Sequence, residues 1–160
     1  MNQSPPSFAA TAQALTGTTE GVLMGTRIAT LDGLLPVEFL APGDRIITRS
    51  GSVRLVSLSS LLRKDVEVVI ISASAIGHDR PEVDLFVAPE QRLMIRDWRA
   101  KVLFGTATAA IPARQLVDGD FVRLATLPQA RLFTLRFDAQ HVIYAEGLEL
   151  ACPSTTVAAE

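Results

Sequence analysis

Few side chains in this sequence could act as a nucleophile, as an acid or base, or as a metal ligand. The 160 residues include two histidines, His78 and His141, and one cysteine, Cys152. A single cysteine excludes an internal disulfide and a zinc site built from several cysteines. Histidine is the usual choice for metal binding and for proton transfer, but His78 lies in a polar loop with no cysteine near it. We therefore interpret His78 as an exposed loop residue.

Acidic residues close to His78 could supply oxygen ligands to a cation. Asp79, Glu82 and Asp84 follow it along the chain. Calcium-binding loops place a glycine at the sharp turn between their ligands, and this loop has none there. We interpret the three carboxylates as solvated, and the sequence predicts no bound metal and no cofactor.

Composition and charge indicate the class of protein and exclude two kinds of partner. Hydrophobic residues make up 48% of the chain and charged residues 20%, as in a globular domain. The formal net charge of -2 gives neither nucleic acid nor an anionic membrane a reason to bind. No apolar run approaches the ~20 residues of a membrane span, and the N-terminus lacks the basic start of a secretory signal. We expect a cytoplasmic monomer, with an unknown protein partner left open.

The elements that must position any functional side chain begin with two turns between apolar runs. Asp32-Gly33 separates residues 28–30 from residues 34–37, and glycine accepts the positive φ of a tight hairpin turn. Pro42-Gly43 predicts a second turn, because proline presets the first central position and glycine tolerates the left-handed second one. Residues 44–48 then alternate between polar and apolar, as a half-buried strand does.

The same pattern returns later in the chain, which indicates an internal repeat. Residues 34–47 align with 110–123 at an offset of 76, and proline, leucine, glycine and aspartate match in both copies. Residues 22–30 align with 87–95 at the smaller offset of 65, so the second copy has the longer hairpin. Two copies suggest one domain built by duplication, with two β-subunits related by a pseudo-two-fold axis. Alternatively, the recurrence reflects turn chemistry that β-rich proteins share.

The segments outside the repeat also favour strands. Runs rich in Val, Ile, Leu and Ser at residues 53–62 and 66–72 predict a hairpin that turns at Arg63-Lys64-Asp65. Residues 96–101 predict a charged hairpin tip, with Trp98 packed over the hairpin.

Residues 131–137 alternate between two faces of a strand, and the more apolar face should point to the core. The predicted core face carries Phe133, Leu135 and Phe137. The predicted outer face carries Leu132, Thr134 and Arg136.

A single domain is predicted over residues 21–152, because 160 residues suit one domain. Residues 1–17 contain no Lys, Arg, Asp or Glu, and we interpret residues 1–20 as a flexible leader. Residues 153–160 are interpreted as a flexible tail.

Five blocks of sequence carry a family pattern in their order and spacing: residues 25–30 (GTRIAT), 36–44 (PVEFLAPGD), 87–92 (VAPEQR), 112–120 (PARQLVDGD) and 138–147 (DAQHVIYAEG). Together they resemble the bacterial branch of the hedgehog/intein (Hint) domains. The resemblance implies an all-β, horseshoe-like disk of short strands with internal pseudo-two-fold symmetry. It also implies an ancestral chemistry in which the domain cleaves or rearranges its own backbone at its first residue.

The resemblance places the family's active site on four positions, three of which are substituted. The nucleophile, a Cys or Ser in the family, falls on Gly21, which has no side chain to attack the preceding carbonyl. The histidine that protonates the departing amide nitrogen falls on Gln91, which cannot give up a proton at neutral pH. Asp138 is in place, but Gln140 stands where the family has histidine. We expect Gly21, Gln91 and Gln140 to converge in space.

Two other side chains lie beside this pattern. His141 follows the expected histidine position by one residue, and neighbouring strand residues point to opposite faces, so we expect its imidazole to point away from the site. Cys152 resembles the nucleophile that follows an intein, but no Asn precedes it to release the chain, so splicing is not expected.

Three functional hypotheses follow. The preferred one is a catalytically degenerate Hint-like domain kept as a β-scaffold or interaction domain. The second is an active autoprocessing domain that uses Thr18, Thr19 or Thr26 as its nucleophile. The third is an unrelated small β-barrel that binds a ligand.

Overall fold

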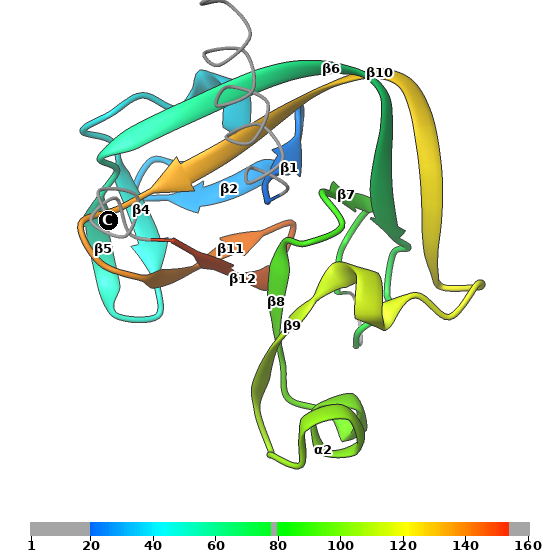
Figure 1. Cartoon of the computed structure of the whole chain (residues 1–160). Helices are drawn as coiled ribbons and strands as arrows, with labels where there is room; N and C mark the ends of the chain where they lie inside the picture. The colour runs from blue at the N-terminus through cyan, green and yellow to red at the C-terminus, as the bar shows by residue number, and fades with distance from the viewer. Residues whose placement is uncertain (1–19, 78–79, 154–160) are drawn as a thin grey trace, which may run out of the picture.

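The computed structural model describes residues 20–77 and 80–153, and strands dominate this part of the chain (Figure 1). The predicted all-β class is confirmed. The first half carries β1 (Val22–Leu23), β2 (Arg27–Thr30), β3 (Gly33–Pro36), the 3-10 helix η1 (Val37–Phe39), β4 (Arg45–Thr48), β5 (Gly51–Arg54) and β6 (Ser57–Ile71). The second half carries β7 (Leu85–Val87), β8 (Arg92–Ile95), α2 (Trp98–Phe104), β9 (Ala109–Pro112), the 3-10 helix η2 (Ala113–Leu116), β10 (Val122–Arg136), β11 (His141–Ala145) and β12 (Leu148–Cys152).

Both turns predicted in the first copy are confirmed. β2 and β3 pair antiparallel across Asp32-Gly33, where Gly33 takes a φ of +105°. Gly43 takes a φ of +98° in the turn before β4. The buried Thr30 closes the first turn, because its hydroxyl donates to the Gly33 carbonyl at 2.8 Å. A side chain at the end of β2 therefore fixes the hairpin in addition to the glycine.

The order of elements repeats at the predicted offsets. The strands β2 and β8 begin at positions aligned by the offset of 65, and β3 with η1 aligns with β9 and η2 at the offset of 76. The loop between β8 and β9 spans residues 96–108 and contains α2, whereas residues 31–32 suffice between β2 and β3. The repeated order is what an internal duplication predicts, while the half-turn rotation between the copies stays a prediction.

The hairpin predicted from residues 53–62 and 66–72 is wrong. β6 runs unbroken from Ser57 to Ile71 and pairs antiparallel with β10 along its length. Asp65, expected in a turn, takes a φ of +49° and faces Pro128, which has no amide hydrogen to donate. Figure 1 shows the two strands bending together partway along their length. The polar residues near 65 lie on a largely exposed two-stranded ribbon, and the strand continues through them.

The charged hairpin tip predicted at residues 96–101 is a helix instead. The Asp97 carboxylate caps the first turn of α2 by accepting from the Arg99 amide at 2.9 Å, and Gly105 ends the helix in a left-handed conformation. Trp98 is 65% exposed, so the prediction that it packs over the hairpin is wrong. No helix within the described ranges has the length and apolar content to cross a bilayer.

Two sheets share the core. One has the strand order β3-β2-β4-β11-β12-β8-β9, with β5 paired to β4, and the other closes β1, β10, β6 and β7 into a small barrel. The predicted core face of β10 is confirmed, because Phe133, Leu135 and Phe137 are all buried in the main cluster. Leu132 and Thr134, predicted to face outward, are buried as well. The reason is that Leu132 packs in a second buried cluster with Val66, Ala88 and Ala130, while the Thr134 hydroxyl bonds to the Glu20 carbonyl.

An ion pair joins the first copy to the last hairpin of the chain. Arg27 in β2 donates from Nη2 to Glu146 Oε1 at 2.8 Å and from its amide to Glu146 Oε2 at 2.9 Å. The Glu146 side chain is only 5% exposed, and its hydrogen bonds and charge raise the pKa of Arg27. Glu146, which follows β11, therefore holds β2 at a fixed place in the larger sheet.

Candidate functional site

The peptide bond between Glu20 and Gly21 is held by two side chains that lie far away in the sequence. The Gly21 amide donates to Gln91 Oε1 at 2.8 Å in a buried contact. The Glu20 carbonyl accepts from the Thr134 hydroxyl at 3.0 Å. Gln91 precedes β8 and Thr134 belongs to β10, so the peptide lies where the second copy of the repeat meets the barrel.

The orientation of the Gln91 amide follows from its other partners. Its Nε2 donates to the carbonyls of Arg92, at 3.1 Å, and Ala151, at 3.0 Å. Carbonyls accept and do not donate, so the NH₂ group must face them and the oxygen must face Gly21. Gln91 is 4% exposed and all of its buried polar atoms are bonded. The group next to the Gly21 nitrogen is therefore an acceptor that carries no proton to give.

Glycine is the residue that this backbone requires at position 21. Gly21 has a φ of +134°, which residues with a side chain rarely adopt. A Cβ placed there would lie 2.7 Å from the Phe133 carbonyl oxygen and 3.0 Å from the Thr134 hydroxyl. A nucleophilic side chain at position 21 would therefore require β10 or the strand start to move.

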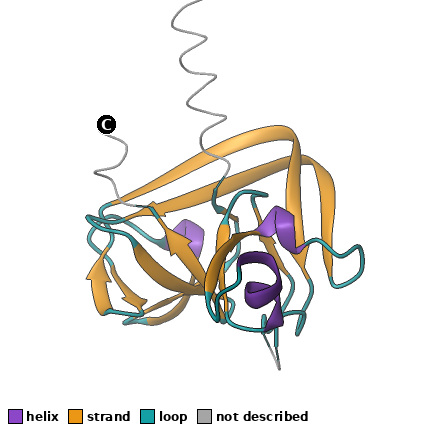
Figure 2. Ribbon diagram, turned by 60° about the horizontal axis from the view of Figure 1, so that its bottom comes forward, coloured by secondary structure: helices purple, strands orange, loops and turns teal. Residues whose placement is uncertain are grey.

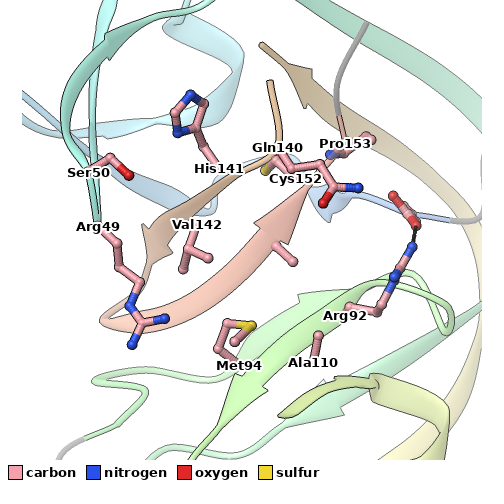
Figure 3. A pocket seen from close by; sticks show the side chains of 12 residues that line it. Arg49, Ser50, Arg92, Met94, Ala110, Gln140, His141, Val142, Cys152 and Pro153 are labelled. Carbon is pink, nitrogen blue, oxygen red and sulfur yellow. Dashed lines mark ion pairs between the residues drawn. The ribbon is translucent and has the colours of Figure 1, made fainter. Parts of the chain in front are cut away.

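A hollow of about 490 Å³ opens beside this peptide, between the β4–β5 turn, β8, β9, β11 and β12 (Figure 3). Glu20 and Arg92 form an ion pair at 3.6 Å on one side of it. Gln140 lines the same hollow, and Figure 3 shows its side chain turned toward Arg92. Gly21 and Gln91 thus make direct contact as expected, whereas Gln140 lies near them without a hydrogen bond to either among the described residues.

His141 lines the same hollow as Glu20, whereas Asp138 is not among its lining residues. The His141 ring packs edge-on against Phe137 at a centroid distance of 5.5 Å, and Nε2 lies 3.9 Å from Asp138 Oδ1. Figure 3 shows the imidazole directed to the opposite side of the strand from the Gln140 side chain. The Asp138 side chain is 80% exposed. The Gly21 nitrogen itself donates to Gln91 Oε1.

Cys152 is buried at the end of β12 and lines the same hollow. Burial raises the pKa of its thiol from the ordinary value of 9.0 to about 12, and the negative charge of Glu20 acts in the same direction. The reactive form of cysteine is the thiolate, which this environment disfavours. Cys152 therefore packs as a small apolar residue at the end of β12.

Among the other candidates of the sequence, those that the structure describes do not line this hollow. His78, Asp79, Thr18 and Thr19 lie outside the described residues. Glu82 pairs with Arg27 at 3.5 Å, and Asp84 accepts from the Ala73 amide at 2.9 Å. Within residues 20–77 and 80–153, no group of three or more His, Cys, Asp or Glu side chains is placed to hold a metal ion.

Two groups at the site have no signal in the sequence. Thr134 was assigned to the outer face of its strand, and its partner Glu20 lies 114 residues away. The Ala151 carbonyl, which orients Gln91, is a backbone atom 60 residues from it. A local sequence pattern cannot reveal contacts between residues so far apart in the chain. The alternation of residues 131–137 predicted the strand that carries Thr134, but not its contact with Glu20.

Comparison with known proteins gives a family and a fold. A family model described as Hint domain matches residues 21–152. No curated protein matches. Among solved structures, the gp41-1 intein is 10% identical, with a TM-score of 0.54 over 82% of this chain and 97% of that one. A bacterial intein-like domain from Clostridium thermocellum is 13% identical, with a TM-score of 0.54 over 83% and 98% of the two chains. A DnaB intein from Synechocystis sp. PCC 6803 is 11% identical, again with a TM-score of 0.54, over 82% and 98%.

Substitution of Gly21 by alanine tests the close contact with β10. We expect Gly21→Ala to lower the free energy of unfolding by about 1 to 3 kcal/mol more than Gly25→Ala does, measured by urea denaturation. Gly25 is the matched control, because its φ of +94° imposes a similar backbone strain but no atom beyond its chain neighbours lies within 4 Å of its Cβ position. Equal losses for the two variants would show that Gly21 is not packed against the Phe133 carbonyl.

The raised pKa of Cys152 predicts an inert thiol. With a pKa of about 12 in place of 9.0, the native protein has about a thousandfold less thiolate at pH 8. We expect negligible labelling by a disulfide reagent in buffer at this pH and rapid labelling after unfolding in guanidinium. Fast labelling of the folded chain, with native circular dichroism, would contradict the buried placement.

Proposed function

The chain belongs to the Hint domain family, and from that premise we propose that it does not cleave its own backbone at the Glu20–Gly21 peptide and serves as a β-scaffold or interaction domain. The third hypothesis, an unrelated small β-barrel, is wrong because the family model spans residues 21–152. The observation that carries the proposal is the hydrogen bond from the Gly21 amide to the side-chain oxygen Oε1 of Gln91 at 2.8 Å.

Cleavage at this peptide would need two groups whose chemistry the local residues do not supply. A side chain at position 21 would have to attack the Glu20 carbonyl carbon, and glycine has none. A proton would have to reach the amide nitrogen as it leaves, and Gln91 presents an acceptor there. Loss of a positioned acid typically costs about 10² to 10⁴ in rate, and the missing nucleophile removes the covalent route altogether.

One feature of the site would suit backbone chemistry. The Thr134 hydroxyl donates to the Glu20 carbonyl oxygen at 3.0 Å, where negative charge would develop during attack on the carbonyl carbon. In the proposed function this hydrogen bond has a structural role, because it satisfies a carbonyl at the start of the domain. It holds the same peptide that Gln91 holds from the other end.

Autoprocessing through a threonine is the alternative function. Thr26 is 6% exposed in the turn between β1 and β2, and its carbonyl accepts from the Val37 amide at 2.8 Å. Its amide also donates to the Leu23 carbonyl at 3.1 Å, so both backbone polar groups of Thr26 are hydrogen-bonded. These bonds favour a structural role for Thr26.

Intact mass spectrometry of the full 160-residue chain distinguishes the two functions. We expect a single, unchanged mass after prolonged incubation with dithiothreitol or hydroxylamine at neutral pH, because neither reagent finds an ester or thioester to attack. The Gln91→His variant is the control for a hidden nucleophile, since it restores an acid without supplying an attacking group and should also stay whole. A fragment that begins at residue 18, 19, 21 or 26 would overturn the proposal in favour of autoprocessing.

A further inference from the structure

The helix α2 exposes an unusual share of its apolar side chains. Trp98 is 65% exposed and Val102 is 69% exposed, while Leu103 and Phe104 are each 44% exposed. Ala100 is the one buried residue of this helix. Trp98 and Val102 are four residues apart and share one face of the helix, about opposite to Ala100. The most exposed apolar pair therefore points directly away from the rest of the protein.

The segment that carries α2 contributes little to the core. The loop between β2 and β3 has the same place in the first copy and makes its turn without any helix. A seven-residue helix is too short to be stable by itself in water. The sequence nevertheless specifies it, with Asp97 capping its start and Gly105 its end. The longer loop of the second copy thus builds a defined structure whose large apolar side chains remain in solvent.

The position of α2 lets it reach a flat surface. Figure 1 shows the helix at the far end of β8 and β9, on the opposite side of the molecule from β6 and β10. In Figure 2, where this end comes forward, α2 lies in front of the strands. Its outward face can therefore touch an extended surface before the sheets do.

Charge around α2 differs from that of the whole chain. Arg96, Arg99 and Lys101 accompany a single acid, Asp97, and the next acidic residue along the chain is Asp118. Arg99 lies over the Trp98 ring at 5.1 Å and pairs with Asp97, and Arg96 pairs with Glu149. The Lys101 side chain is exposed and has no hydrogen bond or ion pair within the described part of the chain. Because Arg96 and Arg99 are paired with acidic side chains, the tip combines its apolar side chains with one positive charge that is unpaired among the described residues, that of Lys101.

We propose that α2 docks the domain on a lipid bilayer that contains anionic lipid. Trp98 and Val102 enter the interfacial layer, with Leu103 and Phe104 at its edge, and Lys101 meets the anionic headgroups. Tryptophan is enriched at membrane interfaces, and basic residues beside an apolar helix face add attraction to anionic lipid. A single short anchor of this kind binds weakly and reversibly.

A second copy of the chain fits α2 less well than a bilayer does. A stable protein interface takes about 20–30 residues from each side, and the seven residues of α2 present four large apolar side chains. The expectation that no membrane binds rested on the net charge of the whole chain, which does not show that the exposed Lys101 lies beside the apolar face of α2. The proposal does not depend on whether the Glu20–Gly21 peptide is inert.

Trp98 is the only tryptophan of the chain and reports directly on its own environment. With the full chain and vesicles of phosphatidylcholine plus phosphatidylserine, we expect its emission to shift to shorter wavelength and its quenching by acrylamide to fall. Vesicles of phosphatidylcholine alone should give a smaller effect. Val102→Asp should weaken co-sedimentation with the anionic vesicles by about tenfold or more, because it places a charge in the inserted face.

Two further variants keep the test decisive. Leu31→Asp changes a similarly exposed residue, 60% exposed, at the matching hairpin of the first copy, and should bind as the unmodified chain does. Lys101→Glu alters an exposed side chain and should reduce binding to anionic vesicles selectively. Absence of any emission shift with either kind of vesicle, or equal losses in Leu31→Asp and Val102→Asp, would overturn the proposal. A Trp98 shift that grows with protein concentration without lipid, with a dimer in sedimentation velocity, would assign α2 to self-association instead.

Discussion

The hydrogen bond between the Gly21 amide and the Gln91 side chain holds the start of β1 in place. Through Gln91 the start of β1 is tied to β8, and through the bond from Gln91 to the Ala151 carbonyl it is tied to β12. β1 belongs to the small barrel, whereas β8 and β12 belong to the larger sheet. One buried amide side chain thus joins the two halves of the core at the point where the chain enters it, and leaving any of its polar atoms unbonded would be costly.

The same contact shows that the residues at the family's catalytic positions have structural reasons in this Hint domain. The positions that the family resemblance assigns to nucleophile and acid carry glycine and glutamine, and both side-chain choices have a structural reason. Gly21 fits against the Phe133 carbonyl where a Cβ would not, and Gln91 accepts from the amide that an acid would have to protonate. These contacts support the proposal that the site has a structural role, because each satisfies a packing or hydrogen-bonding need of the ground state.

Sequence reasoning succeeded where the causes are local. The turns at Gly33 and Gly43 need positive φ, which glycine provides, and the alternation of residues 131–137 indicates the core face. Each of these features could be predicted from a few neighbouring residues. The continuous β6 could not, because the strand continues through Asp65 by pairing with β10, which lies far away in the sequence. The end signals of α2 were present, but the charged residues between them favoured a polar tip. At the site, the resemblance located Gln91, whereas the direction of its amide depends on Ala151, 60 residues away.

Native-state hydrogen exchange of the Gly21 amide tests the central contact most directly. The structure predicts that this amide exchanges as slowly as that of Ala88, which donates to the Gly21 carbonyl at 2.9 Å and serves as the internal reference. In a Gln91→Met variant, which keeps the size of the side chain but removes the acceptor, the Gly21 amide should exchange at least about tenfold faster than in the unmodified chain. Rapid exchange of Gly21 in the unmodified protein, or exchange that Gln91→Met leaves unchanged, would show that Gln91 does not hold this peptide and would contradict the account.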